Sequence, residues 1–236
     1  MTNATTRLAA WFSQHLPEYL EDLAPGSSDA ALAELEALVG FDLPEDFKDL
    51  YRWHDGQKTN YRPGLFYGME FLSLKEVGRR WRAWQDVIRS GWDDIGAFVS
   101  APPGAVQEAY ANPGWIAFAI DRGGNCIGID LDPGPAGTRG QVINFGRDED
   151  EKFVLAPNLN GFLEWLAGQL EAGNFLITEV PNPPVVERIR LAVPRERDGA
   201  QIQAAVPIRR VLNTEDPPTH HFLDSIKVMF AGQRGE

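Results

Sequence analysis

The fold is decided by the stretch Trp115-Ile-Ala-Phe-Ala-Ile120, Asp121-Arg-Gly-Gly-Asn125 and Ile127-Gly-Ile-Asp-Leu-Asp132. In the first and last segments apolar side chains occupy every second position, and a period of two is typical of a β-strand. The middle segment combines Asp, Gly and Asn, which favour a tight turn. Together the three segments predict a β-hairpin with one apolar face.

Upstream of the hairpin the apolar period lengthens to that of a helix. Apolar side chains at i, i+3, i+4 and i+7 predict four helices, over Thr5–Tyr19, over Asp29–Val39, from Pro44 to a stop at Gly56, and over Leu74–Ser90. Ser73 with Glu76 and Asp42 with Glu45 are expected to form capping boxes at two of the helix starts. Gly40 is expected to cap the second helix in a left-handed conformation.

Downstream of the hairpin the pattern predicts two further strands and a closing helix. The strands are expected at Gln141–Phe145 and Phe153–Leu155, and the helix at Leu159–Glu171 with Asn158 as its N-cap. Residues 92–114 contain proline-glycine turns and are predicted to be mostly loop. This order of elements predicts an α+β fold, with a central antiparallel sheet flanked by helices and a C-terminal appendage.

The composition changes near Pro181-Asn-Pro-Pro184. Residues 1–180 carry a net charge of −13 and all Trp and Tyr residues, whereas residues 181–236 carry +1. Proline-rich stretches of this kind often separate domains. We therefore expect a domain at residues 1–180 and an extension of unknown role at residues 181–236.

The overall charge and the cysteine content limit the class of protein. A net charge of −12 argues against a nucleic-acid partner and against an anionic membrane, because both need clustered cations. One cysteine, Cys126, excludes an intramolecular disulfide. No apolar run is long enough for a transmembrane helix, and the first residues are amphipathic, unlike a secretory signal. These features predict a cytoplasmic protein.

Few residues are candidates for catalysis. A small-substrate hydrolase could use Cys126 with His15 or His54 as its base, or the pair Asp130 and Asp132. No catalytic motif surrounds any of them, and hydrogen-bonded histidines or solvated carboxylates explain the same residues. An enzyme is therefore the weakest of the functional hypotheses.

Metal ligands are equally scarce in the sequence. His220 and His221 are adjacent, so their side chains diverge on a helix and face opposite sides on a strand. Asp130 and Asp132 share a strand face but lack further ligands at loop spacing. We expect no metal site and no cofactor.

Acidic and aromatic residues offer a surface for a protein partner. Trp53 lies beside Asp55 at a predicted helix end, and a Trp side chain among carboxylates can anchor an interface. The candidate contacts are Trp53, Asp55, Asp130, Asp132, Asp148, Glu149, Asp150 and Glu151. A solvated surface, or for Trp53 a lid over the sheet, is the alternative interpretation.

Five sequence blocks follow one another in a distinctive order. They are Glu34–Gln57 with its Leu43-Pro-Glu-Asp-Phe47 segment, Gly64–Trp84, Trp115–Asp132, Gly140–Ile143 and Leu159–Leu166. Their order resembles the SUKH superfamily, and within it the Smi/Knr branch, over about residues 8–175. The resemblance implies an α+β fold without catalytic residues. It also implies architectural roles for the shared positions Leu43, Pro44, Asp46, Gly56, Asp121, Gly124 and Asp130.

The resemblance implies two functions. Bacterial members are largely associated with immunity proteins, so the first hypothesis is a non-catalytic immunity protein that neutralises a cognate toxin. A basic, nuclease-like toxin would suit an acidic inhibitor, because opposite charges steer the two proteins together. Fungal founders regulate cell-wall assembly, so the alternative is an intracellular regulatory scaffold in which residues 181–236 carry the specificity.

Overall fold

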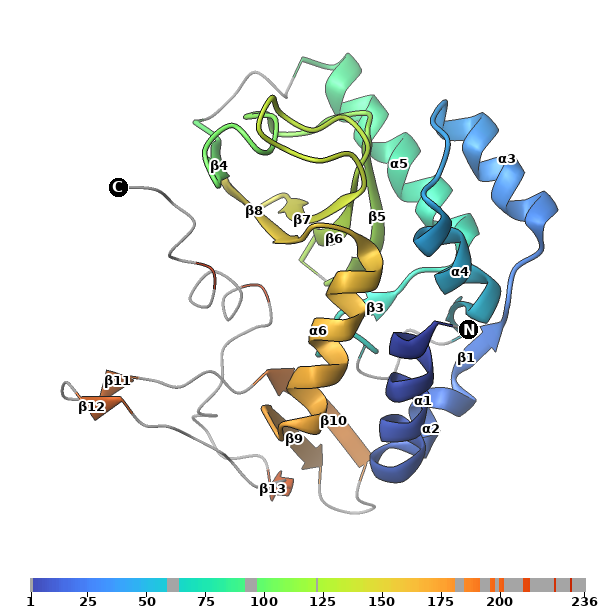
Figure 1. The fold of residues 1–236 in the computed structure, drawn as a ribbon, viewed down its shortest axis with the longest axis vertical. Coiled ribbons are helices and arrows are strands. Elements are labelled where there is room, and N and C mark those ends of the chain that lie inside the picture. Colours follow the sequence, from blue (N-terminus) through green and yellow to red (C-terminus); the bar gives the residue numbers. More distant parts are fainter. Residues whose placement is uncertain are drawn as a thin grey trace.

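The predicted hairpin forms the middle of a six-stranded sheet in the computed structural model of the chain (Figure 1). The strand order is β3-β5-β6-β7-β8-β4. The strands are β3 (Glu70–Phe71), β4 (Val99–Ala101), β5 (Trp115–Ile120), β6 (Asn125–Asp130), β7 (Gln141–Gly146) and β8 (Glu151–Ala156). The structure describes residues 2–58, 64–91, 97–121, 123–180, 185–191, 196–197, 200–201, 210–212, 223 and 230.

Helices surround this sheet in the described part of the chain. They are α1 (Asn3–His15), α2 (Pro17–Glu21), α3 (Asp29–Val39), α4 (Glu45–Trp53), α5 (Leu74–Arg89) and α6 (Leu159–Glu171). Phe118 of β5 packs on Phe162 of α6, with ring centroids 5.9 Å apart. Phe145 of β7 packs on Trp84 of α5, with centroids 6.2 Å apart. The α+β architecture is therefore confirmed.

The central hairpin has the predicted apolar face, but the structure buries its other face as well. Every residue of β6 is buried, and in β5 only Ile120 is partly exposed. A bulge at Ala117–Ala119 shifts the register of β5 against β6. Because helices contact the strands from both sides, the small and polar positions of the hairpin are covered as well as the aliphatic ones.

Local capping signals position three helices, and two of the caps, Ser73 and Asn158, are as predicted. Ser28, Ser73 and Asn158 each accept a hydrogen bond from a backbone N–H in the first turn of α3, α5 and α6. Such caps satisfy donors that the helix itself leaves unpaired. Gly40 ends α3 with a left-handed φ of 77°.

Two predicted helices differ from those in the structure. The helix expected over Thr5–Tyr19 is broken at Leu16, because Pro17 lacks an N–H and begins α2 instead. The helix expected to run to Gly56 ends at Trp53, since residues 54–57 form β2 (His54–Gln57) and pair with β1 (Leu23–Pro25).

One local prediction is wrong, and another, that residues 92–114 are mostly loop, holds in the described residues except for one short strand. Pro44 is the N-cap of α4 and no side chain caps this helix, so the capping box of Asp42 with Glu45 does not form. The predicted loop at 92–114 contains β4, which pairs in parallel with β8. That pairing depends on a distant strand, and local sequence carries no signal for it.

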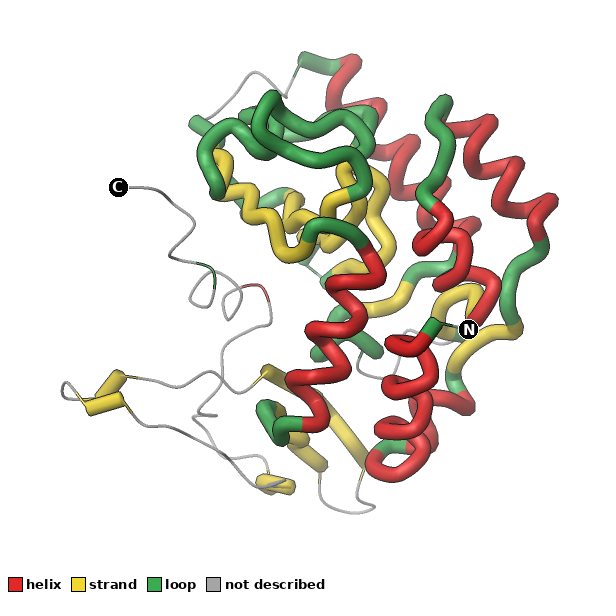
Figure 2. Tube along the Cα trace, in the orientation of Figure 1, coloured by secondary structure: helices red, strands yellow, loops and turns green. Residues whose placement is uncertain are grey.

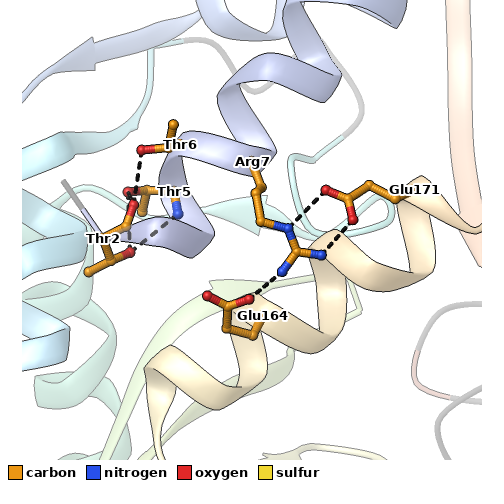
Figure 3. Close-up of polar contacts among 6 residues, drawn as sticks. All are labelled: Thr2, Thr5, Thr6, Arg7, Glu164 and Glu171. Carbon is orange, nitrogen blue, oxygen red and sulfur yellow. Dashed lines mark hydrogen bonds and ion pairs between the residues drawn. The ribbon is translucent and has the colours of Figure 1, made fainter.

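Ion pairs join the N-terminal helix α1 to α6 (Figure 3). The Arg7 guanidinium donates to both carboxylate oxygens of Glu171, with Nε 2.9 Å from Oε1, and it also pairs with Glu164. Thr2 caps the same helix by accepting from the backbone N–H of Thr5. Beneath these polar contacts Leu8 and Phe12 of α1 lie in the core.

The C-terminal residues form further strands. They are β9 (Phe175–Val180), β10 (Val185–Leu191), β11 (Glu196–Arg197), β12 (Ala200–Gln201) and β13 (Arg210–Leu212). Strand β9 pairs with both β10 and β13, while β11 pairs with β12. Figure 2 shows β9 and β10 apart from the six-stranded sheet, at the far end of α6.

Two residues from the C-terminal extension reach the main core. Leu223 is 1% exposed within it, and the Phe230 ring lies 6.2 Å from that of Trp165 on α6. The predicted domain boundary at residue 181 also falls between two strands, β9 and β10, that pair with each other.

Candidate functional site

The predicted partner-binding residues lie in three separate parts of the fold. Trp53 and Asp55 are at the junction of α4 and β2, and Asp130 and Asp132 are at the end of β6. The acidic run 148–151 lies in the β7–β8 turn and at the first residue of β8. It is next to the opposite end of β6, because Asn125 pairs with Gly146 and Asp130 with Gln141. The structure therefore does not assemble them into one surface.

The acidic β7–β8 turn is tied to the turn of the central hairpin. The Asp148 N–H donates to Asn125 Oδ1 at 2.9 Å, and Asn125 Nδ2 donates to Asp121 Oδ2 at 2.9 Å. Asp121 also accepts from the backbone N–H of Gly123, at 2.7 Å. Asp148 is about half exposed and pairs with Arg147. The turn is thus a rigid, solvent-facing anionic edge.

Glu149 of that turn is buried, although its position in an acidic run suggests an exposed side chain. Its carboxylate accepts from Asn144 Nδ2, and its carbonyl oxygen accepts from the Lys152 ammonium. Lys152 is fully buried, with its Nζ 4.8 Å from the centre of the Phe98 ring and 5.8 Å from that of Trp115. The two side chains stabilise the end of the sheet. Of the acidic run, Asp148 and Asp150 are exposed, whereas Glu151 is partly buried.

Asp130 is the buried carboxylate of the sheet. Its Oδ2 accepts from Gln141 Nε2 at 2.9 Å, and its Oδ1 accepts from the Asp132 N–H at 3.1 Å. Burial raises the pKa of Asp130 to about 6, although the contact with Gln141 opposes the rise. Asp132 is exposed and accepts from Asn112 at 3.0 Å. Of this predicted pair, only Asp132 is open to a partner.

Trp53 and Asp55 have structural roles at the α4–β2 junction. Asp55 Oδ1 accepts from the Leu74 N–H at 2.7 Å, so it joins β2 to the start of α5. Trp53 is half-buried against the core, and the centroid of its ring lies 4.6 Å from that of the His54 ring. Both residues are partly exposed.

The positions shared with the family pattern hold the elements together. Leu43 is buried, and Asp46 accepts from the backbone N–H of Asn160, which links α4 to α6 at 3.1 Å. Gly56 has a φ of +73° with Ser73 and Leu72 packed directly against it, so no side chain fits there. Gly124 has a φ of +101° in the hairpin turn.

Cys126 has the properties of a buried structural thiol. It is fully buried, and desolvation raises its pKa to about 12. At neutral pH such a group stays protonated and is a poor nucleophile. The two candidate bases lie on other elements, His15 on α1 and His54 on β2, where His54 Nδ1 hydrogen-bonds to the Ala24 carbonyl oxygen at 2.7 Å.

No metal-binding group of three His, Cys, Asp or Glu side chains occurs within the described residues. His220 and His221 lie outside those residues. Among the described helices, none is long and apolar enough to cross a membrane.

Sequence analysis missed a group of cations on α5. The exposed charged side chains of this helix are Lys75, Arg79, Arg82, Asp86 and Arg89, here called the basic stripe. Their spacing of i, i+4, i+7, i+11 and i+14 places them on one face. The sequence contains this spacing, but the apolar stripe of the same helix and the net negative charge of the chain drew attention to other residues.

The geometry defines a class of protein: an α+β domain with a helix-covered sheet, a buried thiol and charged surfaces. A family profile identifies the class further. It matches residues 26–165, and the chain belongs to the SMI1 / KNR4 family (SUKH-1). The predicted resemblance is confirmed.

Curated fungal relatives match most of this chain. The cell wall biosynthesis/cell cycle regulator of Schizosaccharomyces pombe is 38% identical over 187 residues, which cover 75% of this chain and 37% of the relative. The cell wall assembly regulator of Saccharomyces cerevisiae is 32% identical, with 72% and 40% covered. The glucan synthesis regulatory protein of Neurospora crassa is 31% identical, with 75% and 39% covered. The chain thus spans about two fifths of the length of these relatives.

Proposed function

We propose that this chain is a non-catalytic regulatory module that acts through protein contacts in the control of cell-wall assembly. One observation carries the proposal: relatives 31–38% identical over about three quarters of the chain are named as regulators of cell-wall or glucan synthesis. The buried thiol of Cys126 and the scattered carboxylates are in keeping with a role other than catalysis. The proposed location is the cytoplasm, where a single free cysteine is stable.

The toxin-neutralising hypothesis has weaker support than the regulatory one. It needs an acidic surface that could cover a basic groove, but Asp130 and Glu149 are buried and the remaining carboxylates lie in three places. The names of the fungal relatives describe regulation. The immunity function therefore has no specific observation in its favour here.

A segment exchange in yeast tests the proposal. The region of the Saccharomyces cerevisiae regulator that matches this chain would be replaced by the corresponding residues of this chain. The chimera would be expressed in cells that lack the regulator, and growth would be measured on a cell-wall-binding dye. We expect the chimera to restore growth to near the level of the intact regulator.

A matched control separates function from mere expression. The chimera with Phe47→Asp places a charge in a fully buried site and should unfold the domain. It should restore no growth. If the unmodified chimera accumulates normally, resists proteolysis and still leaves growth at the level of the deletion strain, the proposed function is wrong.

A further inference from the structure

The basic stripe of α5 stands out against the charge of the whole chain. Helix α5 holds five of the 22 Lys and Arg residues together with two carboxylates, a net charge of +3 in a chain of −12. Arg79 and Arg89 are 65% and 70% exposed. Along the helix the stripe runs from Lys75 to Arg89, a length of about 21 Å.

Two cations of the stripe are unpaired. Lys75 and Arg82 make no hydrogen bond or ion pair within the described residues. Within the described part of the chain, Arg79 forms an ion pair with Glu76 and Arg89 with Asp86, at 2.6 and 2.7 Å within the same helix. Exposed pairs of this kind contribute little to stability, so they can be exchanged for contacts with a partner.

Three cations of the stripe, Lys75, Arg79 and Arg82, are placed unfavourably for the helix itself. Lys75 and Arg79 are four residues apart and Arg79 and Arg82 three apart, so like charges face each other. Lys75 also lies in the first turn, where the helix dipole disfavours a cation. Neither arrangement benefits the fold, which favours a role outside it.

The chemistry of the occupant follows from charge and size. Nucleic acids and anionic membranes extend well beyond the stripe and would meet the acidic surfaces of the same chain. Electrostatic interactions fade over a Debye length of about 8 Å at physiological salt, so a short anionic segment can meet the stripe without that repulsion. Carboxylates spaced i, i+4 and i+7 on a helix would match Lys75, Arg79 and Arg82.

We propose that the basic stripe of α5 is a docking surface for a short acidic segment of a partner protein. The inference deepens the proposed function and rests on it for the idea that this chain works through protein contacts. Binding would be carried by Lys75 and Arg82, with Arg79 and Arg89 exchanging their intrahelical partners for carboxylates of the segment.

Peptide binding to the full chain tests the inference. The probe is a fluorescein-labelled peptide of 16 residues with Glu at helical spacing i, i+4, i+7 and i+14, which matches Lys75, Arg79, Arg82 and Arg89. Its anisotropy is measured at low and high salt. The test variant is Lys75→Glu with Arg82→Glu. The control is Lys58→Glu with Arg139→Glu, which changes the net charge equally at exposed cations outside α5.

We expect the peptide to bind the wild-type chain at low salt and to lose affinity at 0.5 M NaCl. The α5 variant should bind at least about tenfold more weakly, while the control keeps most of its affinity. Circular dichroism should show that both variants remain folded.

Four results would overturn the inference. They are no peptide binding at low salt, an equal loss in both variants, tighter binding of an RNA oligonucleotide or of phosphatidylserine vesicles through the stripe, or self-association that Lys75→Glu with Arg82→Glu abolishes. Each of these can occur while the yeast chimera still restores growth, so failure here is distinguishable from failure of the proposed function.

Discussion

At the scale of single residues, Gly40 and Gly56 show how surroundings decide the need for glycine. Both are left-handed, with φ of +77° and +73°, but a Cβ on Gly40 meets nothing within 4 Å. A Cβ on Gly56 would lie 2.3 Å from the Ser73 backbone nitrogen. We expect Gly40→Ala to lower the free energy of unfolding by about 1 kcal/mol, the conformational cost alone.

Gly56→Ala should cost about 3 kcal/mol or more, because backbone at the start of α5 must also move. Urea unfolding of the two variants measures the difference. Equal losses would show that the α4–β2 junction adapts to a side chain.

Asp130 predicts a pH dependence of stability. Its pKa of about 6 in the folded chain lies above the value of about 3.9 in an unfolded chain. The folded state therefore binds this proton more tightly, so the contribution of Asp130 to stability is fully present below pH 4 and is lost as pH rises through about 6. The fall amounts to about 3 kcal/mol at most, because each pKa unit corresponds to ~1.4 kcal/mol.

The free energy of unfolding between pH 4 and 7 tests this assignment. In Asp130→Asn this part of the pH dependence should disappear, whereas Asp132→Asn, an exposed neighbour, should keep it. The same slope in wild type and Asp130→Asn would show that another group titrates.

At the scale of elements, the Arg7 contacts should hold α1 against α6. Arg7→Ala removes a guanidinium that bridges Glu164 and Glu171, so we expect the melting temperature to fall by a few degrees. Arg89→Ala removes an exposed pair within one helix and should have almost no effect. At 1 M NaCl the two variants should differ less, because salt screens the partly exposed pairs.

Element prediction succeeded where the deciding signal was local. The Ser73 and Asn158 caps, the left-handed Gly40 and the alternation of β5 and β6 lie within a few residues of the structure that they determine. It failed where distant contacts decide. Helix α4 stops at Trp53 because β1 pairs with the next residues, and β4 exists because β8 lies beside it.

The candidate site was harder to predict for the same reason. Residue type suggested that Asp130 and Glu149 would be exposed, yet Gln141 and Asn144 satisfy their carboxylates inside the fold. Sequence spacing could not show which residues lie beside the two ends of β6, where Asn125 pairs with Gly146 and Asp130 with Gln141. The cations of α5 follow a helical period and could have been found from sequence.

At the scale of the whole molecule, Leu223 connects the C-terminal extension to the core. Its side chain is 1% exposed, so Leu223→Ala should lower the free energy of unfolding by about 2 kcal/mol or more through lost packing. Val99→Ala is the matched control, because Val99 is 46% exposed and its truncation should cost little. Thermal unfolding of both variants gives the comparison. Equal, small losses would show that the extension does not contribute to the stability of the body.

The parallel pairing of β4 with β8 has a consequence for the order of folding. Val99 pairs with Glu151, so the pairing closes a loop that contains the whole of β5 to β7. Closing such a long loop is entropically slow, and edge strands gain few contacts in return. The β4 segment is therefore expected to dock last on the folding pathway and to open first under native conditions. The edge of the sheet next to the acidic turn would then open transiently, while the central hairpin of β5 and β6 stays folded.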